Sequence, residues 1–332
     1  MSAAVEPHLA LVRMLADGRF HSGEAIAEHL GVTRAAVWKA LRRAADRFGL
    51  EVESVRGRGY RLPVPLELLD REAILGAMSD AGRNAVSRVE IHDRIDSTNA
   101  YLMREAALGM PSGVACLAER QTAGRGRRGR VWVSPFGVNL YLSLLWRFPL
   151  APAALGGISL AVGAVLADLL HAEGVADLTL KWPNDLLWRR RKLAGLLLEV
   201  SGESQGPSHL VVGLGINLRM QTGQGDEIEQ PWASLEEALQ GRPCPRNRLA
   251  GKVLDVLAGA LDLYGREGLE PFAELWRRFD GLHGEPVRLM LGERVVCGTH
   301  AGIADDGSLI LETGGGRMRF QAGEVSLRAM GS

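Results

Sequence analysis

The sequence has few cysteines, no excess of either charge and no long uninterrupted apolar run. Its three cysteines, Cys116, Cys244 and Cys297, are far apart and include no CxxC pair, which excludes a disulfide framework and a local zinc motif. The eight histidines include no HxxxH pair, so we predict no structural metal. Lysine plus arginine equals aspartate plus glutamate at 39 each, so attraction to a polyanion has to come from a local basic cluster.

No segment has the pattern of a signal peptide or a transmembrane helix. The longest candidate, Leu155 to Leu170, is interrupted by Gly163 and Asp168. We therefore expect a cytoplasmic protein with no membrane partner. At 332 residues, with 46% apolar and 23% charged residues, the chain is long enough for two or three folded domains and too apolar to be disordered.

The first region, residues 7–48, has the apolar spacing of three short helices. Ser22 and Thr33 stand where helix N-caps are expected, and Gly31 marks a turn between the second and third helices. Residues 52–62 then have the pattern of a hairpin with two glycines at its turn. The order of helix, turn, helix and wing predicts a winged helix-turn-helix DNA-binding domain.

Basic residues gather in this first region. Between Arg34 and Arg61 there are eight basic and three acidic residues, a net charge of +5, which suits contacts with phosphates. A solvated basic face on a small structural domain is the alternative. The residues predicted to contact DNA are Arg34, Lys39, Arg42, Arg43, Arg56 and Arg58.

The remaining chain divides into two further regions. From residue 65 to 280, strand-like runs, one of them at Val131 and Val133, accompany two helical patterns, Ile158 to Leu169 and Leu249 to Tyr264. Hairpins outnumber βαβ units there, and short strands with turns follow to the end. We predict a multidomain α+β fold, with a winged helix at residues 1–64, a mixed sheet with flanking helices at 65–280, and a small β-barrel at 281–332.

Residues Gly124 to Arg130 read Gly-Arg-Gly-Arg-Arg-Gly-Arg and match the GxGxxG dinucleotide pattern. A Rossmann turn requires a helix directly after it, whereas Val131 to Pro135 is extended and ends in proline. We therefore reject the Rossmann interpretation. What remains is a flexible loop whose arginines and glycines suit a phosphorylated, anionic ligand. A solvated basic loop and a second nucleic-acid patch are the alternatives.

Five motifs, taken in order, closely resemble those of the biotin protein ligases. They are Asp96-Ser97-Thr98-Asn99, Gly124 to Arg130, Lys181-Trp182-Pro183-Asn184-Asp185, Arg191-Lys192-Leu193-Ala194-Gly195 and Gly213-Leu214-Gly215-Ile216-Asn217. With its winged helix, the chain is similar to the bifunctional bacterial form that is also the biotin operon repressor. The resemblance covers nearly the whole length. It implies a central sheet like that of class II synthetases and an SH3-like C-terminal barrel.

The resemblance implies a reaction in two halves. The biotin carboxylate attacks the α-phosphate of ATP to give biotinoyl-5'-AMP and pyrophosphate, and the acyl group then passes to a lysine of the biotin carboxyl carrier protein of acetyl-CoA carboxylase. Because two anions have to meet, the site needs cations, and Mg2+ has to screen the pyrophosphate. The expected cofactors are ATP and Mg2+, with biotin as the substrate.

The site residues of the family carry over onto matching positions. Lys192, Arg125, Arg127 and Asp185 are the implied catalytic residues, and Asp185 positions the acceptor lysine or takes its proton. A structural turn at Asn184-Asp185 is the alternative for that residue. The implied biotin contacts are Ser97, Thr98, Asn99, Gln121, Gly124, Arg125, Arg127, Trp132, Lys192, Gly195 and Gly215. The implied nucleotide contacts are Arg127, Lys192, Asn217 and Trp232, with Asn217 near Mg2+ by way of phosphate.

The resemblance also implies regulation. The adenylate is the corepressor: it strengthens a homodimer and so presents two winged helices to operator DNA. Three other interpretations stay open. They are a ligand-sensing winged-helix regulator without catalysis, a lipoate-type acyl ligase, and a ligase whose N-terminal domain serves only dimerisation or stability.

Overall fold

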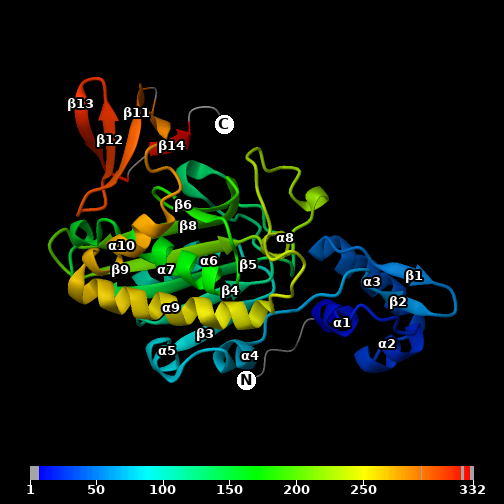
Figure 1. Ribbon diagram of the computed structural model, residues 1–332. Coiled ribbons are helices and arrows are strands. Elements are labelled where there is room, and N and C mark those ends of the chain that lie inside the picture. The colour runs from blue at the N-terminus through cyan, green and yellow to red at the C-terminus, as the bar shows by residue number, and fades with distance from the viewer. Residues whose placement is uncertain (1–6, 293, 323–324, 330–332) are drawn as a thin grey trace.

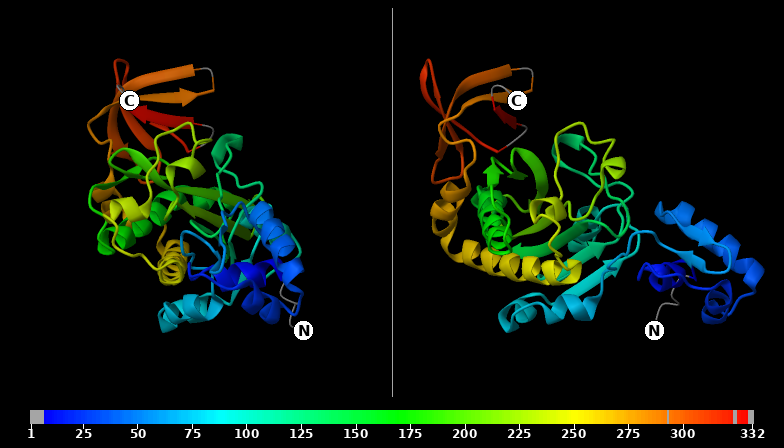
Figure 2. Two further views of the ribbon diagram at one scale, coloured as in Figure 1. Left: turned by 90° about the vertical axis from the view of Figure 1, so that its right-hand side faces the viewer. Right: turned by 45° about the vertical axis from the view of Figure 1, so that its right-hand side comes forward.

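The computed structural model describes residues 7–292, 294–322 and 325–329. These residues form three regions, and the first and last of them lie at opposite ends of a central body (Figure 1 and Figure 2). A mixed central sheet with helices stands between an N-terminal helical region and a C-terminal region of strands. The predicted multidomain α+β fold is confirmed.

The N-terminal region is a winged helix-turn-helix. Helices α1 (Pro7–Leu15), α2 (Gly23–Leu30) and α3 (Arg34–Phe48) precede a two-stranded wing, β1 (Glu53–Val55) and β2 (Gly59–Arg61). The hydroxyls of Ser22 and Thr33 accept main-chain hydrogen bonds in the first turns of α2 and α3, and Gly31 ends α2 with a φ of 63°. The predicted caps and turn are therefore confirmed.

The core of the winged helix extends into the central body. Phe48 is buried at the end of α3. Phe136, which comes from a loop of the central body, lies in the same core with its ring centroid 4.5 Å from that of Phe48. The Arg120 guanidinium donates a hydrogen bond to the carbonyl oxygen of Arg47 at 3.1 Å. The C-terminal end of α3 is thus docked on the central body.

The central body is built on a seven-stranded sheet. Its strands are β3 (Arg88–His92), β4 (Val114–Ala118), β5 (Leu140–Phe148), β6 (Leu178–Lys181), β7 (Asp185–Trp188), β8 (Arg191–Gly202) and β9 (Ser208–Ile216). They lie in the order β3-β4-β5-β9-β8-β7-β6, with β3 and β4 parallel and the other neighbours antiparallel. The strand-like pattern at Val131 and Val133 gives no strand, because this segment lies outside the sheet and Val131 forms only an isolated bridge with Arg125.

Helices cover both faces of this sheet. One face carries α7 (Ile158–Ala172), α9 (Arg246–Glu267) and α10 (Glu270–Phe279), and the other carries α6 (Thr98–Ala107). Alternation along β4 explains the division, since Ala115 and Leu117 join the first cluster and Cys116 joins the second. The short elements are α4 (Arg71–Gly76), α5 (Asp80–Ala85), α8 (Leu235–Ala238) and the 3-10 turns η1 (Arg127–Gly129), η2 (Pro152–Leu155) and η3 (Thr222–Gln224).

Residues Pro152–Ala172 form a helical segment that is long and apolar enough to cross a membrane by composition alone. Most of it is α7, whose Val162, Leu166 and Leu170 are fully buried in the main core of the protein. The apolar character of α7 is therefore explained by its packing against the sheet and α9.

The C-terminal region is a five-stranded antiparallel sheet. Its strands are β10 (Pro286–Leu291), β11 (Arg294–Ile303), β12 (Leu309–Thr313), β13 (Gly316–Phe320) and β14 (Val325–Ala329), in the order β13-β12-β11-β10-β14. Trp182 Nε1 donates a hydrogen bond to the Gly307 carbonyl oxygen at 3.1 Å, and His300 Nε2 lies 2.8 Å from Asp280 Oδ2. These contacts fasten the predicted β domain to the end of the central sheet and to α10.

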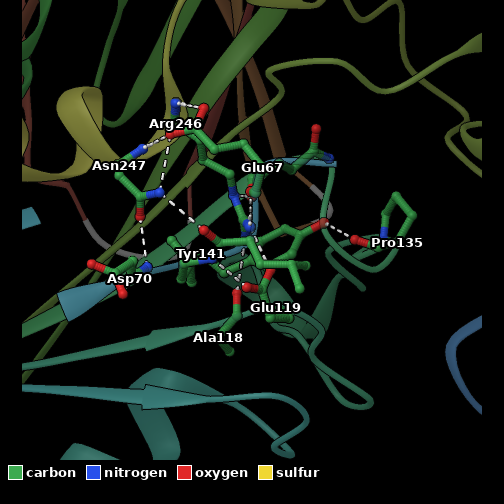
Figure 3. Close-up of polar contacts among 11 residues, drawn as sticks. Glu67, Asp70, Ala118, Glu119, Pro135, Tyr141, Arg246 and Asn247 are labelled. Atoms are coloured by element: carbon green, nitrogen blue, oxygen red, sulfur yellow. Dashed lines mark hydrogen bonds and ion pairs between the residues drawn. The ribbon is translucent and has the colours of Figure 1, made fainter. Parts of the chain in front are cut away.

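A buried polar network ties the linker after the wing to the central body (Figure 3). Arg246, in the first turn of α9, is 3% exposed, and its guanidinium pairs with the buried Glu119. Glu67, in the linker, accepts hydrogen bonds from the main-chain N–H groups of Arg246 and Asn247 at 2.6 and 3.0 Å. Because buried charges have to be paired, these contacts hold the linker, the end of β4 and the start of α9 in one arrangement.

Candidate functional site

The predicted site residues converge on a cavity of about 450 Å³. It lies between the start of α6, adjoining parts of β8 and β9, and the loop that follows Gly124. Gly124 is buried and is not among the residues that line the cavity, and a β-carbon there would come within 2.7 Å of the Trp132 carbonyl oxygen. Ten of the eleven residues predicted to contact biotin line the cavity: Ser97, Thr98, Asn99, Gln121, Arg125, Arg127, Trp132, Lys192, Gly195 and Gly215. Their roles in binding stay predictions.

One end of the cavity is lined by uncharged polar side chains, and one of them, Asn99, donates a hydrogen bond to Glu199 Oε2 at 2.9 Å. The main-chain N–H and the hydroxyl of Thr98 donate hydrogen bonds to Gln121 Oε1 at 2.9 and 3.1 Å. The Ser143 hydroxyl lies 2.6 Å from Asn99 Oδ1 and 2.7 Å from Thr98 Oγ1. Ser97 caps α6 by accepting a main-chain hydrogen bond at 3.4 Å. Donors and acceptors held at fixed positions suit a neutral polar group such as a ureido ring.

Trp132 forms an apolar wall across two glycines. A β-carbon at Gly215 would lie 2.4 Å from Trp132 Cε2, and one at Gly195 would lie 3.0 Å from Cζ3. Glycine at these two positions therefore allows the indole to lie directly against β8 and β9. The Nε1 of Trp132 is buried and has no hydrogen-bond partner among the described residues, and a β-carbon at Gly215 would lie 2.6 Å from it.

The other end of the cavity is charged. Arg127 and Lys192 line it, whereas Lys181 and the predicted catalytic residue Asp185 do not. Lys192 Nζ lies 2.7 Å from Asp185 Oδ1, and Lys181 Nζ lies 3.7 Å from Asp185 Oδ2. The Arg127 guanidinium donates a hydrogen bond to Asn184 Oδ1 at 3.1 Å. Burial lowers the pKa of Arg127 and of Lys181, while the nearby Asp185 carboxylate opposes the shift in both. Cationic groups are thus gathered where water screens them little, which suits an anionic ligand.

The loop from Gly124 to Arg130 folds back over the cavity. The Gly126 N–H donates to the Arg130 carbonyl oxygen at 2.8 Å, and the Trp132 N–H donates to the Gly124 carbonyl oxygen at 2.9 Å. Arg125 Nη2 lies 3.6 Å from an oxygen of Glu199 on β8. A turn that closes on itself, with no α-helix after it, agrees with the rejection of a Rossmann phosphate turn.

A second cavity of about 310 Å³ adjoins the first and shares Trp132 and Lys192 with it. Asn217 and Trp232, two of the predicted nucleotide contacts, line this second cavity. The main chain of Lys192 pairs with the segment beside Trp232, since the Lys192 N–H donates to the Pro231 carbonyl oxygen at 2.9 Å. The Asn217 amide donates to the Lys192 carbonyl oxygen at 3.4 Å. Lys192 therefore lies between the two cavities.

For some residues of the site, the sequence predicts no ligand contact and no catalytic role. Lys181 and Asn184 belong to a motif that carries the resemblance, yet their partners become clear only in the fold. Ser143 and Glu199 lie in the long strands β5 and β8. These strands are largely apolar, so the sequence pattern predicts a strand at each position and no site residue. A polar residue at an inward position of an apolar strand is the signal that could have identified Ser143.

The six residues predicted to contact DNA are all exposed on α3 and the wing. The outer face of α3 also carries Trp38, which is 56% exposed and lies under the Arg42 guanidinium at 5.4 Å. At the wing, the Arg58 guanidinium lies 4.2 Å from the Phe20 ring centroid. The structure thus places these side chains where a duplex can reach them, and their contacts stay predictions.

Three segments of the chain match known families. Residues 91–217 match the Biotin/lipoate A/B protein ligase family, residues 8–61 an HTH domain, and residues 282–328 the biotin protein ligase C-terminal domain. The chain is 44% identical to the bifunctional ligase/repressor BirA of Salmonella typhimurium and 43% identical to that of Escherichia coli, in each case over 97% of both chains. The biotin protein ligase from Aquifex aeolicus, solved in complex with biotin and ATP, matches with a TM-score of 0.63 and 30% identity, over 73% of this chain and 99% of that one.

Proposed function

Because the chain belongs to the family of bifunctional biotin protein ligases and repressors, we propose that its adjoining cavities hold biotin and ATP. The chain then transfers biotin to a lysine of the biotin carboxyl carrier protein of acetyl-CoA carboxylase. The observation that carries this proposal is Lys192, which lines both cavities and is held by Asp185 at 2.7 Å. A cation at that junction lies where the biotin carboxylate and the α-phosphate have to meet.

In the first half-reaction, a carboxylate oxygen of biotin attacks the α-phosphorus of ATP. The carboxylate oxygen bonds to phosphorus as the bond to pyrophosphate breaks. Lys192, Arg125 and Arg127 neutralise the charge of the two anions and orient them. Trp132 packs along the apolar chain of biotin and keeps water out. The proposed contacts to the ureido ring and its surroundings are Ser97, Thr98, Asn99, Gln121, Gly124, Gly195 and Gly215.

In the second half-reaction, the amine of the acceptor lysine attacks the acyl carbonyl. An amide forms, and AMP leaves with the electron pair of the broken carbon–oxygen bond. The amine has to lose its proton before it attacks, and Asp185 is the group that we assign to positioning it or to taking that proton. Both oxygens of Asp185 face lysines at 2.7 and 3.7 Å, so the acceptor amine has to enter a place that already suits an ammonium group.

We assign the nucleotide to the second cavity, with adenine stacked on Trp232 and phosphates near Arg127, Lys192 and Asn217. The described residues contain no group of three or more histidine, cysteine or acidic side chains that could hold a metal. Asp185 is engaged by two lysines, so it does not fit a resident cation site. We therefore assign Mg2+ to the triphosphate itself, with Asn217 near the phosphate that carries it.

The repressor function is assigned to the winged helix. Its phosphate contacts would be Arg34, Lys39, Arg42, Arg43, Arg56 and Arg58. A homodimer is supported by β8, which pairs with β7 only as far as Gly195 and continues to Gly202 with β9 on one side. The other edge of residues 198–202, beyond the Leu197 carbonyl oxygen that accepts from Asn99, offers main-chain groups to a second copy. Because Arg125 of the loop from Gly124 to Arg130, called the ligand loop below, reaches Glu199 on that edge, adenylate binding is expected to strengthen the dimer.

Domain boundaries after residues 64 and 280 are also part of this proposal. The linker network begins at Glu67, just after the first boundary, and Asp280 pairs with His300 across the second. Residues 1–6, 293, 323–324 and 330–332 of the outer domains lie outside the described residues. We place the protein in the cytoplasm, without a membrane partner, since its longest apolar helix is packed in the core.

The experiment that tests the proposed function is incubation of the full chain with biotin and MgATP in the absence of an acceptor. Mass spectrometry should detect biotinoyl-AMP retained on the chain, together with released pyrophosphate. Lipoate in place of biotin is the matched control. Preference for lipoate would favour an acyl ligase of that type, and a folded chain that forms no adenylate would favour a ligand-sensing regulator.

A further inference from the structure

Asp185 lies between two lysines at the start of β7. Its Oδ1 is 2.7 Å from Lys192 Nζ, and its Oδ2 is 3.7 Å from Lys181 Nζ. The three side chains are largely buried, with exposed fractions of 12% for Asp185, 15% for Lys192 and 24% for Lys181. Lys192 lines both cavities, whereas Lys181 lines neither of them. One carboxylate therefore has a cation on the ligand side and a second cation behind it.

Lys192 contacts Asp185 while it lines both cavities, so an anionic ligand bound there competes with Asp185 for its ammonium group. As its ammonium group is drawn toward the biotin carboxylate and the α-phosphate, the contact with Asp185 weakens, and Asp185 is then a buried carboxylate close to two incoming anions. A buried charge that loses its partner is strongly unfavourable. Lys181 is within ion-pair distance of the other carboxylate oxygen and has no need to move.

We propose that Lys181 is a positioning residue of the adenylation step. It holds Asp185 charged and in place, so that Lys192 is free to turn to the ligand. Lys181 itself touches neither biotin nor nucleotide. This proposal rests on the proposed function of the two cavities and adds to it a residue for which the sequence predicts no role.

The surroundings of Lys181 make this role depend on Asp185. Burial lowers the pKa of Lys181, and the charges of Lys192, Arg130 and Arg328 lower it further, while Asp185 raises it. Asp185 is thus the group that stabilises the ammonium form. When Asp185 is replaced by asparagine, Lys181 is a desolvated cation among other cations. Removing Lys181 in that background should therefore lower the rate of adenylate formation no further.

The test is a double-mutant cycle in the full chain, with K181M, D185N and the variant that carries both. The measured quantity is the single-turnover rate of biotinoyl-AMP formation at saturating biotin and MgATP. We expect K181M to lower this rate about tenfold in the presence of Asp185 and to have no further effect in the D185N background. K181R, which keeps the charge, should recover most of the rate.

Lys252→Met is the matched control. Lys252 is also partly buried and paired with an acid, Glu173, but it lies on α9 away from both cavities. Its variant should keep the rate of the unchanged chain. If K181M unfolds the chain, K181Q, which keeps a polar side chain without the charge, enters the same cycle and should behave in the same way.

Equal losses from K181M in both backgrounds would overturn the proposal, because they would show that Lys181 acts independently of Asp185. Failure of K181R to recover the rate would point to a role in packing and would overturn it too. A full rate in K181M or in D185N also contradicts it. By contrast, an unchanged chain that forms no adenylate would refute the proposed function itself.

The pH dependence gives a second measurement that packing alone would not change. Because the pKa of Lys181 is lowered, its ammonium form is lost at a lower pH than that of an ordinary lysine. As pH rises through that value, Asp185 loses its second cation in the unchanged chain, whereas arginine keeps its charge. The ratio of the K181R rate to the unchanged rate should therefore rise with pH, and a constant ratio would contradict the proposal.

Discussion

Two arginine–glycine segments of nearly the same composition fold differently in this protein. In the wing, Gly57 and Gly59 have φ values of 82° and 108°, they turn the chain between β1 and β2, and the arginines beside them are exposed. In the ligand loop, Arg127 is half-buried and donates to Asn184, while Arg125 lies 3.6 Å from Glu199. The same residue types form an exposed edge in one place and a cavity wall in the other.

The difference between the two segments comes from what lies opposite them. The wing tip faces water, where salt screens the attraction between arginine and phosphate. The ligand loop faces Trp132 and Lys192, and burial there lowers the pKa of Arg127. Charge interactions are stronger where water is excluded. Loss of an arginine should therefore cost more in the loop than in the wing.

The largest effect is expected for R127Q in the ligand loop. Removal of a cation that stabilises developing charge in a desolvated site should lower the rate of adenylate formation by about 10²–10³-fold. Single-turnover assays with biotin and MgATP measure this rate. R128Q is the control, since Arg128 is exposed in the same loop and its loss should change the rate by no more than about twofold. Equal losses in both variants would show that the loop acts through its total charge.

G215A should have the next largest effect, because it acts on the wall opposite the loop. The new β-carbon would lie 2.4 Å from Trp132 Cε2, so the indole has to move into the space assigned to biotin. We expect biotin affinity to fall about 10–200-fold, as measured by calorimetry. At Gly223 a β-carbon meets nothing within 4 Å, so G223A should bind biotin normally. Unchanged affinity in G215A would argue against the placement of biotin beside Trp132.

A pair of glycine substitutions compares the two segments directly. Gly59 in the wing has a φ of 108°, and a β-carbon there would lie 2.0 Å from the His21 carbonyl oxygen. Gly126 in the loop has a φ of −105°, and its nearest neighbour would be 3.7 Å away. G59A should lower the free energy of unfolding of the winged helix by about 1–3 kcal/mol. G126A should change the free energy of unfolding of the central body by less than about 0.5 kcal/mol.

Chemical denaturation followed by circular dichroism measures both glycine variants. If G126A proves as destabilising as G59A, the loop is held more tightly than its contacts indicate. It would then be wrong that glycine conformation determines the fold of the wing whereas side-chain contacts determine that of the loop.

Periodicity and turn chemistry predict much of the fold, because they act over a few residues. The caps at Ser22 and Thr33, the wing and the mixed sheet follow from such patterns. The helices α4 and α5 do not, since six residues complete fewer than two turns and leave no clear repeat. The pattern at Val131 misleads for a related reason: the segment alternates like a strand, but its only ladder contact is an isolated bridge between Val131 and Arg125.

At the candidate site, contacts between residues far apart in the sequence are harder still to predict. The motifs name Lys192 and Asp185, yet the second lysine on Asp185 depends on the hairpin that pairs β6 with β7. Glu199 meets Arg125 across more than seventy residues of sequence, because β8 passes under the ligand loop. Residue type and order therefore predict which groups take part, whereas which group contacts which depends on strand register.

The smallest effect is expected in the wing, for the double variant R56Q/R58Q. Each lost phosphate contact lowers the slope of log K against log salt concentration by about 0.9, so the slope should fall by about 2 and the affinity for duplex DNA by about tenfold. Fluorescence anisotropy at several salt concentrations, with a duplex from the promoter of the biotin genes, measures both. Adenylate formation should be unchanged, since neither arginine lines a cavity.

R61Q is the matched control for the wing. Arg61 lies on the same hairpin, but its guanidinium pairs with Glu53 at 2.6 Å, so the salt slope should stay close to that of the unchanged chain. If R61Q lowers the slope as much as the loss of an arginine at the tip, the wing binds DNA through its total charge. The position of each arginine would then determine its effect on adenylate formation in the ligand loop, whereas in the wing only the number of arginines would determine DNA affinity. The two segments would differ in mechanism as well as in burial.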